Sequence, residues 1–251
     1  MKYTAQIVTQ LKIERKENLI IFEVDLEYKE FKEKEILFCS FEILEMRIVK
    51  APVELYLLNP LNNVGKIVFE INENKKIKRI KNFGEIKERV KIYYKKLKEE
   101  ITSSLEEKEI IQQFSYGIFD TEEKTLKELL SVMYLYAFLG GNYNVDFQEK
   151  TNIDGYTKDY RIPIKYTKKT ENNITKINGE VDRENISFFM LEHEMKDLGI
   201  EYDEKKLYFK WEEEIVYNID ENIENVRMFR EGGIKTKIEK KEIMIINRIG
   251  E

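Results

Sequence analysis

The side chains that enzymes use most often for proton transfer and nucleophilic attack are scarce in this chain. Its 251 residues include one histidine, His193, and one cysteine, Cys39. One chain therefore cannot assemble a histidine-based triad, a Cys/His pair, a multi-histidine zinc site or a cysteine cluster. Carboxylate, lysine and tyrosine side chains are the groups left for catalysis. We accordingly expect a binding protein in preference to an enzyme, with no catalytic residue, no cofactor and no metal site.

Neither His193 nor Cys39 is predicted to take part in chemistry. His193 stands between Glu192 and Glu194, but adjacent side chains point to different faces of a strand and do not converge on a helix. The sequence has no HExxH spacing, so we predict an ordinary surface histidine. For Cys39 we predict a buried or half-buried thiol. A lone cysteine cannot form an intramolecular disulfide, which favours the reducing cytoplasm.

A row of acidic residues near the N-terminus could in principle bind a metal ion. Glu23, Asp25 and Glu27 alternate with apolar residues, and Lys29 continues the row, so on a strand these side chains project from one face. Carboxylates at this spacing can bind Mg²⁺, as in metal-dependent nucleases. However, the Glu-x-Lys spacing recurs throughout this chain, which is rich in both residues. We predict a solvated strand face and keep a carboxylate- and Mg²⁺-dependent enzyme as an alternative.

The strongest local clustering of charge lies in residues 75–98, which contain eleven lysine and arginine residues and two glutamates. Four of these lysines fall at spacings of four, four and three, which places them in one stripe along a helix. Such a stripe can contact phosphates or an acidic protein surface, and a neighbouring tyrosine can add contact area. The candidate partner-binding residues are Lys87, Lys91, Tyr94, Lys95 and Lys98. The alternative is a solvated helix face whose charge is balanced by acidic segments such as residues 212–214.

Residues 129–139 form an uncharged stretch of eleven residues. As a helix the stretch would be about 16 Å long, which is about half of the hydrocarbon thickness of a bilayer. It is therefore too short to cross a membrane by itself. We predict a central helix that is buried on most sides, with a partner-docking surface or the wall of a cavity for an apolar ligand as alternatives.

Composition and charge restrict the class of partner. A chain with 42% hydrophobic and 36% charged residues is typical of a soluble globular protein. The net charge of -5 and the pI near 5.4 disfavour nucleic acid or an anionic membrane surface as a partner. The N-terminal residues alternate between polar and apolar types, unlike a signal peptide. We expect a cytoplasmic protein without a transmembrane segment, whose partner is another protein.

Alternating apolar residues predict strands in the N-terminal part of the chain. Odd-numbered apolar positions in residues 3–13 and even-numbered ones in residues 20–28 predict an antiparallel hairpin with one buried face. Spacings of three and four favour a short helix over residues 41–50. Further strands are expected at residues 53–58, 66–71 and 76–80, of which the last two would pair with each other.

The middle of the chain predicts three consecutive helices. They cover residues 85–104, residues 106–119, and the segment from Asp120 or Thr121 to Gly140-Gly141. Asn82 is predicted to cap the first helix from just upstream. The acidic pair Glu122 and Glu123 suits the first turn of the third helix, because the helix dipole favours negative charge there.

The C-terminal part returns to strands. Asn178-Gly179 and Gly232-Gly233 predict hairpin turns, because these residues tolerate a positive φ. Residues 186–198 fit either a strand or a helix. The expected strands cover residues 159–168, 174–177, 180–182, 207–211, 215–219, 226–230 and 234–249.

Together these patterns predict a single α+β domain over residues 1–251, with strands in about 1–81, helices in about 85–140 and strands in about 156–249. The expected architecture is a bent antiparallel sheet, or a half-barrel, with a central block of about three helices. The expected function is a non-catalytic intracellular protein-protein interaction protein, such as an inhibitor, an immunity protein or an assembly accessory. Alternatives are a carrier of an apolar ligand in a half-barrel cavity and the carboxylate- and Mg²⁺-dependent enzyme.

Overall fold

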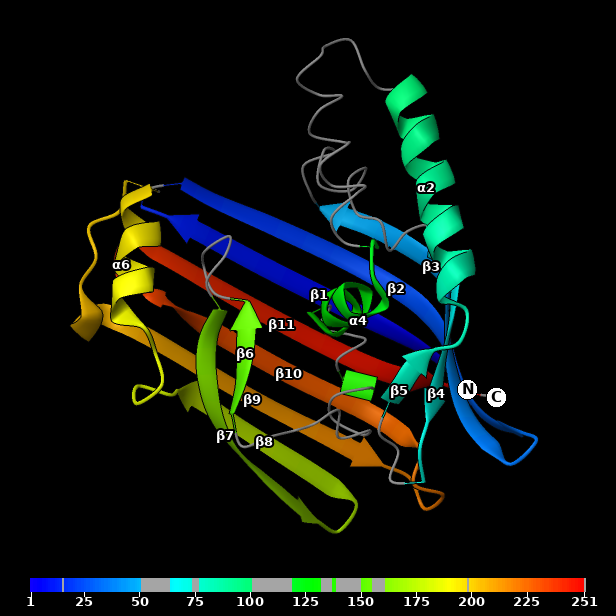
Figure 1. Cartoon of the computed structure of the whole chain (residues 1–251). Coiled ribbons are helices and arrows are strands. Elements are labelled where there is room, and N and C mark those ends of the chain that lie inside the picture. Colours follow the sequence, from blue (N-terminus) through cyan, green and yellow to red (C-terminus); the bar gives the residue numbers. More distant parts are fainter. Residues whose placement is uncertain are drawn as a thin grey trace. The chain divides into compact units, whose positions relative to one another are not determined.

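Strands dominate the fold (Figure 1). The computed structural model describes residues 1–14, 16–50, 64–73, 77–100, 119–131, 137–138, 150–154, 161–197 and 199–250. The strands are β1 (Lys2–Ile13), β2 (Lys16–Glu33), β3 (Ile36–Lys50), β4 (Lys66–Ile71), β5 (Ile77–Ile80), β6 (Lys150–Asp154), β7 (Arg161–Glu171), β8 (Ile174–Val181), β9 (Leu207–Tyr217), β10 (Ile223–Ile234) and β11 (Ile238–Ile249). The helices are α2 (Phe83–Glu100), α4 (Glu122–Ser131), α6 (Phe188–Asp197) and the 3-10 helix η3 (Glu204–Lys206).

The predicted antiparallel sheet is confirmed. Hydrogen-bonded neighbours among the described strands follow the order β5-β4-β3-β2-β1-β11-β10-β9-β8-β7-β6. The α+β class holds only in part, because sheet predominates, and the predicted central block of three helices is not confirmed. Helices α2 and α4 occur where the first and third were expected, while residues 106–118 of the second lie outside the described residues. No helix in the described ranges is long and apolar enough to cross a membrane.

Contacts divide the chain into two compact units. Unit 1 consists of Met1–Thr4, Phe22–Val145 and Ile249–Glu251, and unit 2 consists of Ala5–Ile21 and Asp146–Arg248. Strands β1 and β2 each contribute residues to both units. The single domain expected over residues 1–251 stays a prediction.

The core of unit 1 contains a cluster of aromatic rings. Phe138 lies 4.9 Å from Tyr3, 5.4 Å from Tyr28 and 5.3 Å from Phe41, measured between ring centroids. Phe138 belongs to the apolar stretch 129–139, and it is fully buried, as are Leu129 and Ala137. These three positions agree with the predicted core role of the stretch. The other side chains of the stretch lie outside the described part of the chain.

Residues 41–50 belong to strand β3, so the helix predicted there is wrong. Residues 37–42 pair with β4, from Leu37 opposite Ile71 to Glu42 opposite Lys66, and the strand continues unbroken to Lys50. The ladder satisfies the backbone N–H and C=O groups of the segment, which outweighs a weak local preference for helix. The predicted pairing of β4 with β5 is confirmed. The strand expected at residues 53–58 lies outside the described residues.

Asn82 joins strand β4 to the start of helix α2. Its side-chain Oδ1 accepts a hydrogen bond from the Val68 N–H at 2.9 Å, and its Nδ2 donates to the Lys66 carbonyl at 2.8 Å. The side chain is therefore engaged with the strand, and the predicted helix cap is wrong in this respect. The Asn82 carbonyl still accepts the first helical bond, from the Ile86 N–H, so the predicted place of the helix start is correct.

The two predicted glycine turns of unit 2 are wrong. Asn178-Gly179 lies inside β8, and the turn before β8 is Asn172-Asn173, with φ values of 48° and 62°. Both residues adopt the positive φ that a tight hairpin turn requires, and asparagine tolerates it well. Gly179 instead makes room for its neighbours, since a Cβ there would lie 3.2 Å from Trp211 Cβ and 3.0 Å from Ile164 Cγ2.

Gly232-Gly233 likewise lies inside a strand, β10. The chain turns at residues 235–237, where Thr236 has a φ of 69°. The two shorter strands expected at residues 207–211 and 215–219 are parts of one strand, β9, which ends at Tyr217. The ambiguous segment 186–198 contains helix α6, which buries Leu191 and Met195 at a spacing of four.

Charges alternate across one face of unit 2. A row of charged residues crosses strands β7 to β11, one residue on each strand, and each residue is the register partner of the next. In this order the residues are Lys165, Glu180, Lys210, Glu231 and Lys241. Opposite charges directly across an antiparallel pair contribute about 0.2–1 kcal/mol each, so this row stabilises the strand register.

Candidate functional site

Helix α2 exposes a basic surface. Lys87, Lys91 and Lys95 are exposed, as the predicted stripe requires, whereas the side chain of Lys98 lies outside the description. Lys87 Nζ donates to the main-chain oxygen of Asp120 at 2.9 Å and lies 3.7 Å from its carboxylate. The amine of Lys91 lies 3.7 Å from the carboxylate of Glu88. Two of the three lysines are thus already paired with surface carboxylates.

Tyr94 does not belong to this surface, so its assignment as a partner-binding residue is corrected. The side chain is 3% exposed, and burial raises the pKa of its hydroxyl above the ordinary value. It follows Val90 by four residues, which places it on the buried face of α2. The sequence reasoning overlooked Ile92, which is 48% exposed between Lys91 and Lys95. We call Lys87, Lys91, Ile92 and Lys95 the α2 surface.

The acidic row of β2 is neutralised by cationic side chains. Arg47 of β3 donates to Asp25 at 2.8 Å and lies 3.4 Å from Glu23. The hydrogen bond from Arg47 lowers the pKa of Asp25, and the hydrogen bond from Lys29 lowers that of Glu27. Among the described residues there is no cluster of three or more His, Cys, Asp or Glu side chains arranged to hold a metal ion. The row therefore forms ion pairs within the sheet.

The lone histidine and the lone cysteine lie where the sequence predicts. His193 is exposed on α6, and Cys39 on β3 is fully buried.

Replacing His193 with alanine is expected to change the free energy of unfolding by less than about 0.5 kcal/mol, because the side chain is exposed. Binding to the physiological partner should be unchanged as well. Thermal unfolding and a binding titration of the His193→Ala variant check both points. Weaker binding by a normally folded variant would move the functional site to α6.

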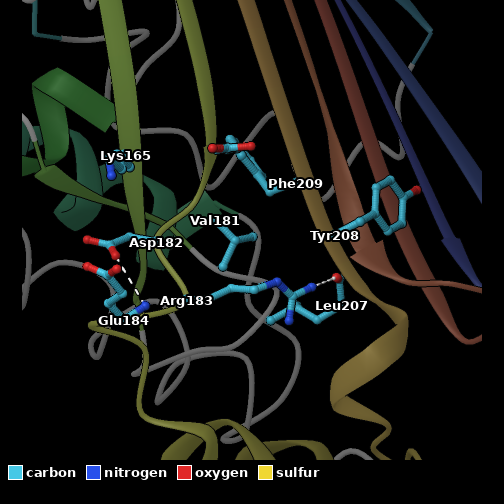
Figure 2. A pocket seen from close by; sticks show the side chains of 9 residues that line it. Lys165, Val181, Asp182, Arg183, Glu184, Leu207, Tyr208 and Phe209 are labelled. Carbon is cyan, nitrogen blue, oxygen red and sulfur yellow. Dashed lines mark hydrogen bonds between the residues drawn. The ribbon is translucent and has the colours of Figure 1, made fainter.

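A shallow pocket of about 390 Å³ opens in unit 2 where β8 ends and β9 begins (Figure 2). Buried Asp182 accepts a hydrogen bond from the Asn185 amide at 2.9 Å and one from the Glu184 N–H at 3.3 Å. Arg183 reaches across the pocket and donates to the Leu207 carbonyl at 2.8 Å. The Asp182 contacts fix the loop after β8, and the Arg183 contact holds this loop against the start of β9, so both residues have structural roles.

The remaining charged groups of the pocket, Lys165, Glu180 and Glu184, are exposed. Lys165 and Glu180 are also neighbours in the alternating charge row. Exposed charges of both signs interact weakly with small ions in water. The pocket is therefore a weaker candidate for a functional site than the α2 surface.

Glu213 is the most unusual ionisable residue described. It is 3% exposed and shares one face of β9 with the buried residues Trp211 and Ile215. Neither of its carboxylate oxygens accepts a hydrogen bond of normal geometry. Burial raises its pKa to about 7, and the charges of Arg230 and Lys168 and the Trp211 indole oppose that rise.

The burial of Glu213 was not predicted, because residues 212–214 are three consecutive glutamates, a run typical of a solvated surface. A signal was present in the alternation, since Trp211, Glu213 and Ile215 have the same parity. The predicted strands covered residues 207–211 and 215–219, so Glu213 fell in the gap between them, whereas β9 includes it.

No protein-family profile matches the chain, and no curated protein matches its sequence.

Proposed function

We propose that the protein is a non-catalytic, cytoplasmic protein-protein interaction protein whose α2 surface binds an acidic partner. The observation that carries the proposal is Ile92, a large apolar side chain that is 48% exposed beside exposed Lys91 and Lys95. Apolar side chains supply the buried centre of an interface, while charges around them steer the partner and fix its orientation. An inhibitor, an immunity protein or an assembly accessory would act through such a surface.

The ion pairs on α2 are compatible with this role. The Lys87–Asp120 and Lys91–Glu88 distances are both 3.7 Å, and all four side chains are about half exposed or more. Exposed ion pairs contribute only about 0–1 kcal/mol. A partner carboxylate can therefore replace Asp120 or Glu88 at little cost in stability.

Two observations favour binding to a protein over the two alternatives. Leu129, Ala137 and Phe138 are fully buried, which supports packing in a core more than the wall of a ligand cavity. The ion pairs of Arg47 with Asp25 and Glu23 leave the acidic row poorly suited to bind Mg²⁺.

Reversing the charge of Lys87, Lys91 and Lys95 to Glu is expected to slow association with the partner at least about 10-fold at low salt. Long-range attraction between charges speeds the diffusional encounter, so the dissociation rate should change less than the association rate. The free energy of unfolding should stay nearly the same, because the three side chains are exposed. Surface-based binding kinetics across a salt series, with the partner isolated from the source cell, measures all three effects.

A control variant reverses Lys12, Lys16 and Lys205, three exposed lysines outside α2. This variant should keep the wild-type association rate. Equal rates for both triple variants would disprove the role of the α2 surface. If nucleic acid were the partner, a plot of log binding constant against log salt concentration would be less steep for the α2 variant than for wild type, by about three units.

A further inference from the structure

The carboxyl group of Glu213 lies among apolar register partners. On β8 its partner is Ile177, which is fully buried, and on β10 its partner is Met228, which is 2% exposed. The two oxygens lack hydrogen-bond partners of normal geometry. Moving an ionised carboxylate into such surroundings is costly, whereas the protonated form carries no net charge. The surroundings therefore favour the protonated form.

The charged and titratable groups facing Glu213 come from the neighbouring strands. Arg230 of β10 is buried beside it and also lies 4.8 Å from the Trp211 ring centroid. Lys168 of β7 is the register partner of Ile177 and so lies two strands away from Glu213. On β9 itself, burial raises the pKa of Tyr217 to about 12, so this hydroxyl stays neutral near pH 7. Strand β8 contributes no titratable side chain to this face, where it carries Thr175 and Ile177.

We propose that Glu213 is a proton-binding switch in unit 2, which keeps β8, β9 and β10 tightly paired when its carboxyl group is protonated and loosens their pairing when it ionises. The switch is independent of the function proposed for α2. Ionisation places a negative charge between Ile177 and Met228, where Arg230 and the Trp211 indole lie near it but neither oxygen accepts a hydrogen bond of normal geometry. Water can reach the carboxylate only if the strands separate locally, so ionisation favours local opening of the sheet.

The direction of the pH effect follows from the pKa values. The pKa of Glu213 is about 7 in the folded protein, above its ordinary value of 4.5. Below the ordinary value both folded and unfolded chains hold the proton. Between the two values the unfolded chain releases it first, so stability falls as pH rises through this window. Above about pH 7 the loss is complete, and the unfolding equilibrium constant has risen on the order of 100-fold.

Denaturant unfolding between about pH 5 and about pH 8 tests the proposal. Trp211 is the only tryptophan of the chain and lies two residues from Glu213, so its fluorescence reports on this site. Across this range the unfolding equilibrium constant of wild type should rise on the order of 100-fold. That rise should be absent in Glu213→Gln. Glu212→Gln is the matched control, because Glu212 is exposed on the opposite face of β9, and it should behave like wild type.

Equal pH dependence of wild type and Glu213→Gln would overturn the proposal, as would the same flattening in Glu212→Gln. A second measurement does not depend on the folding of a variant. The side-chain carbonyl carbons of the wild-type glutamates, followed by NMR during a pH titration, should include one with a midpoint near 7. If every glutamate titrates near its ordinary value, the switch does not exist.

Discussion

Replacing Phe138 with alanine is expected to lower the free energy of unfolding by about 3–5 kcal/mol. The side chain is fully buried, and its ring lies within 5.4 Å of Tyr3, Tyr28 and Phe41. Removing it leaves a cavity and also ends three aromatic contacts, each of which adds about 0.5–1.5 kcal/mol to the effect of area burial. Urea denaturation followed by circular dichroism measures the change.

Ile92→Ala is the control for this experiment, because Ile92 is 48% exposed. It should cost less than about 1 kcal/mol, since little apolar surface is buried there. A Phe138→Ala variant of wild-type stability would show that Phe138 is not a core residue. If that variant also lost a bound apolar ligand, residues 129–139 would belong to a functional surface.

The period of two in apolar residues predicted the strands well, because one face of this sheet is buried. Tyr3, Ala5 and Ile7 on β1 and Val24 and Leu26 on β2 are all buried, and the alternation reports that directly. Strand ends were predicted less well. Strand β2 extends from Lys16 to Glu33, and its polar outer residues are held by pairing with neighbouring strands, which no local pattern shows.

Turn prediction failed where glycine had a second role. At Gly179 a Cβ would lie 3.0 Å from Ile164 Cγ2 and 3.2 Å from Trp211 Cβ, so glycine here relieves crowding within the sheet. Gly233 is needed because of a close backbone approach. A glycine in a turn and a glycine in a strand that neighbouring residues approach closely look the same in the sequence. Which of the two applies depends on residues that are distant in the chain.

The candidate sites were predicted in part. The exposed lysines of α2 follow from helical spacing alone, as does the burial of Tyr94 once the helix register is fixed by Ile86 and Val90. The ion pairs of Arg47 with Asp25 and Glu23 were not predictable, because they depend on the register between β2 and β3. The same holds for the position of Arg230 opposite Trp211, next to Glu213.

Replacing Gly233 with alanine is expected to destabilise the protein by about 2–4 kcal/mol. Gly233 has a φ of 146°, a conformation that L-residues with a side chain rarely adopt. A Cβ at this position would also lie 1.9 Å from the main-chain oxygen of Ile238. Because the clashing atom belongs to the backbone and not to a flexible side chain, the β10–β11 hairpin itself would have to move to accommodate the Cβ.

The control for Gly233→Ala is Gly84→Ala, which should have the opposite sign. Gly84 lies in helix α2, and a Cβ there would have no neighbour within 4 Å. Alanine in a helix is favoured over glycine by about 0.5–1 kcal/mol, because glycine loses more backbone freedom on folding. Denaturant unfolding of the two variants should therefore move the midpoint in opposite directions. Similar midpoints would show that the β10–β11 hairpin tolerates a side chain at Gly233 by shifting its backbone.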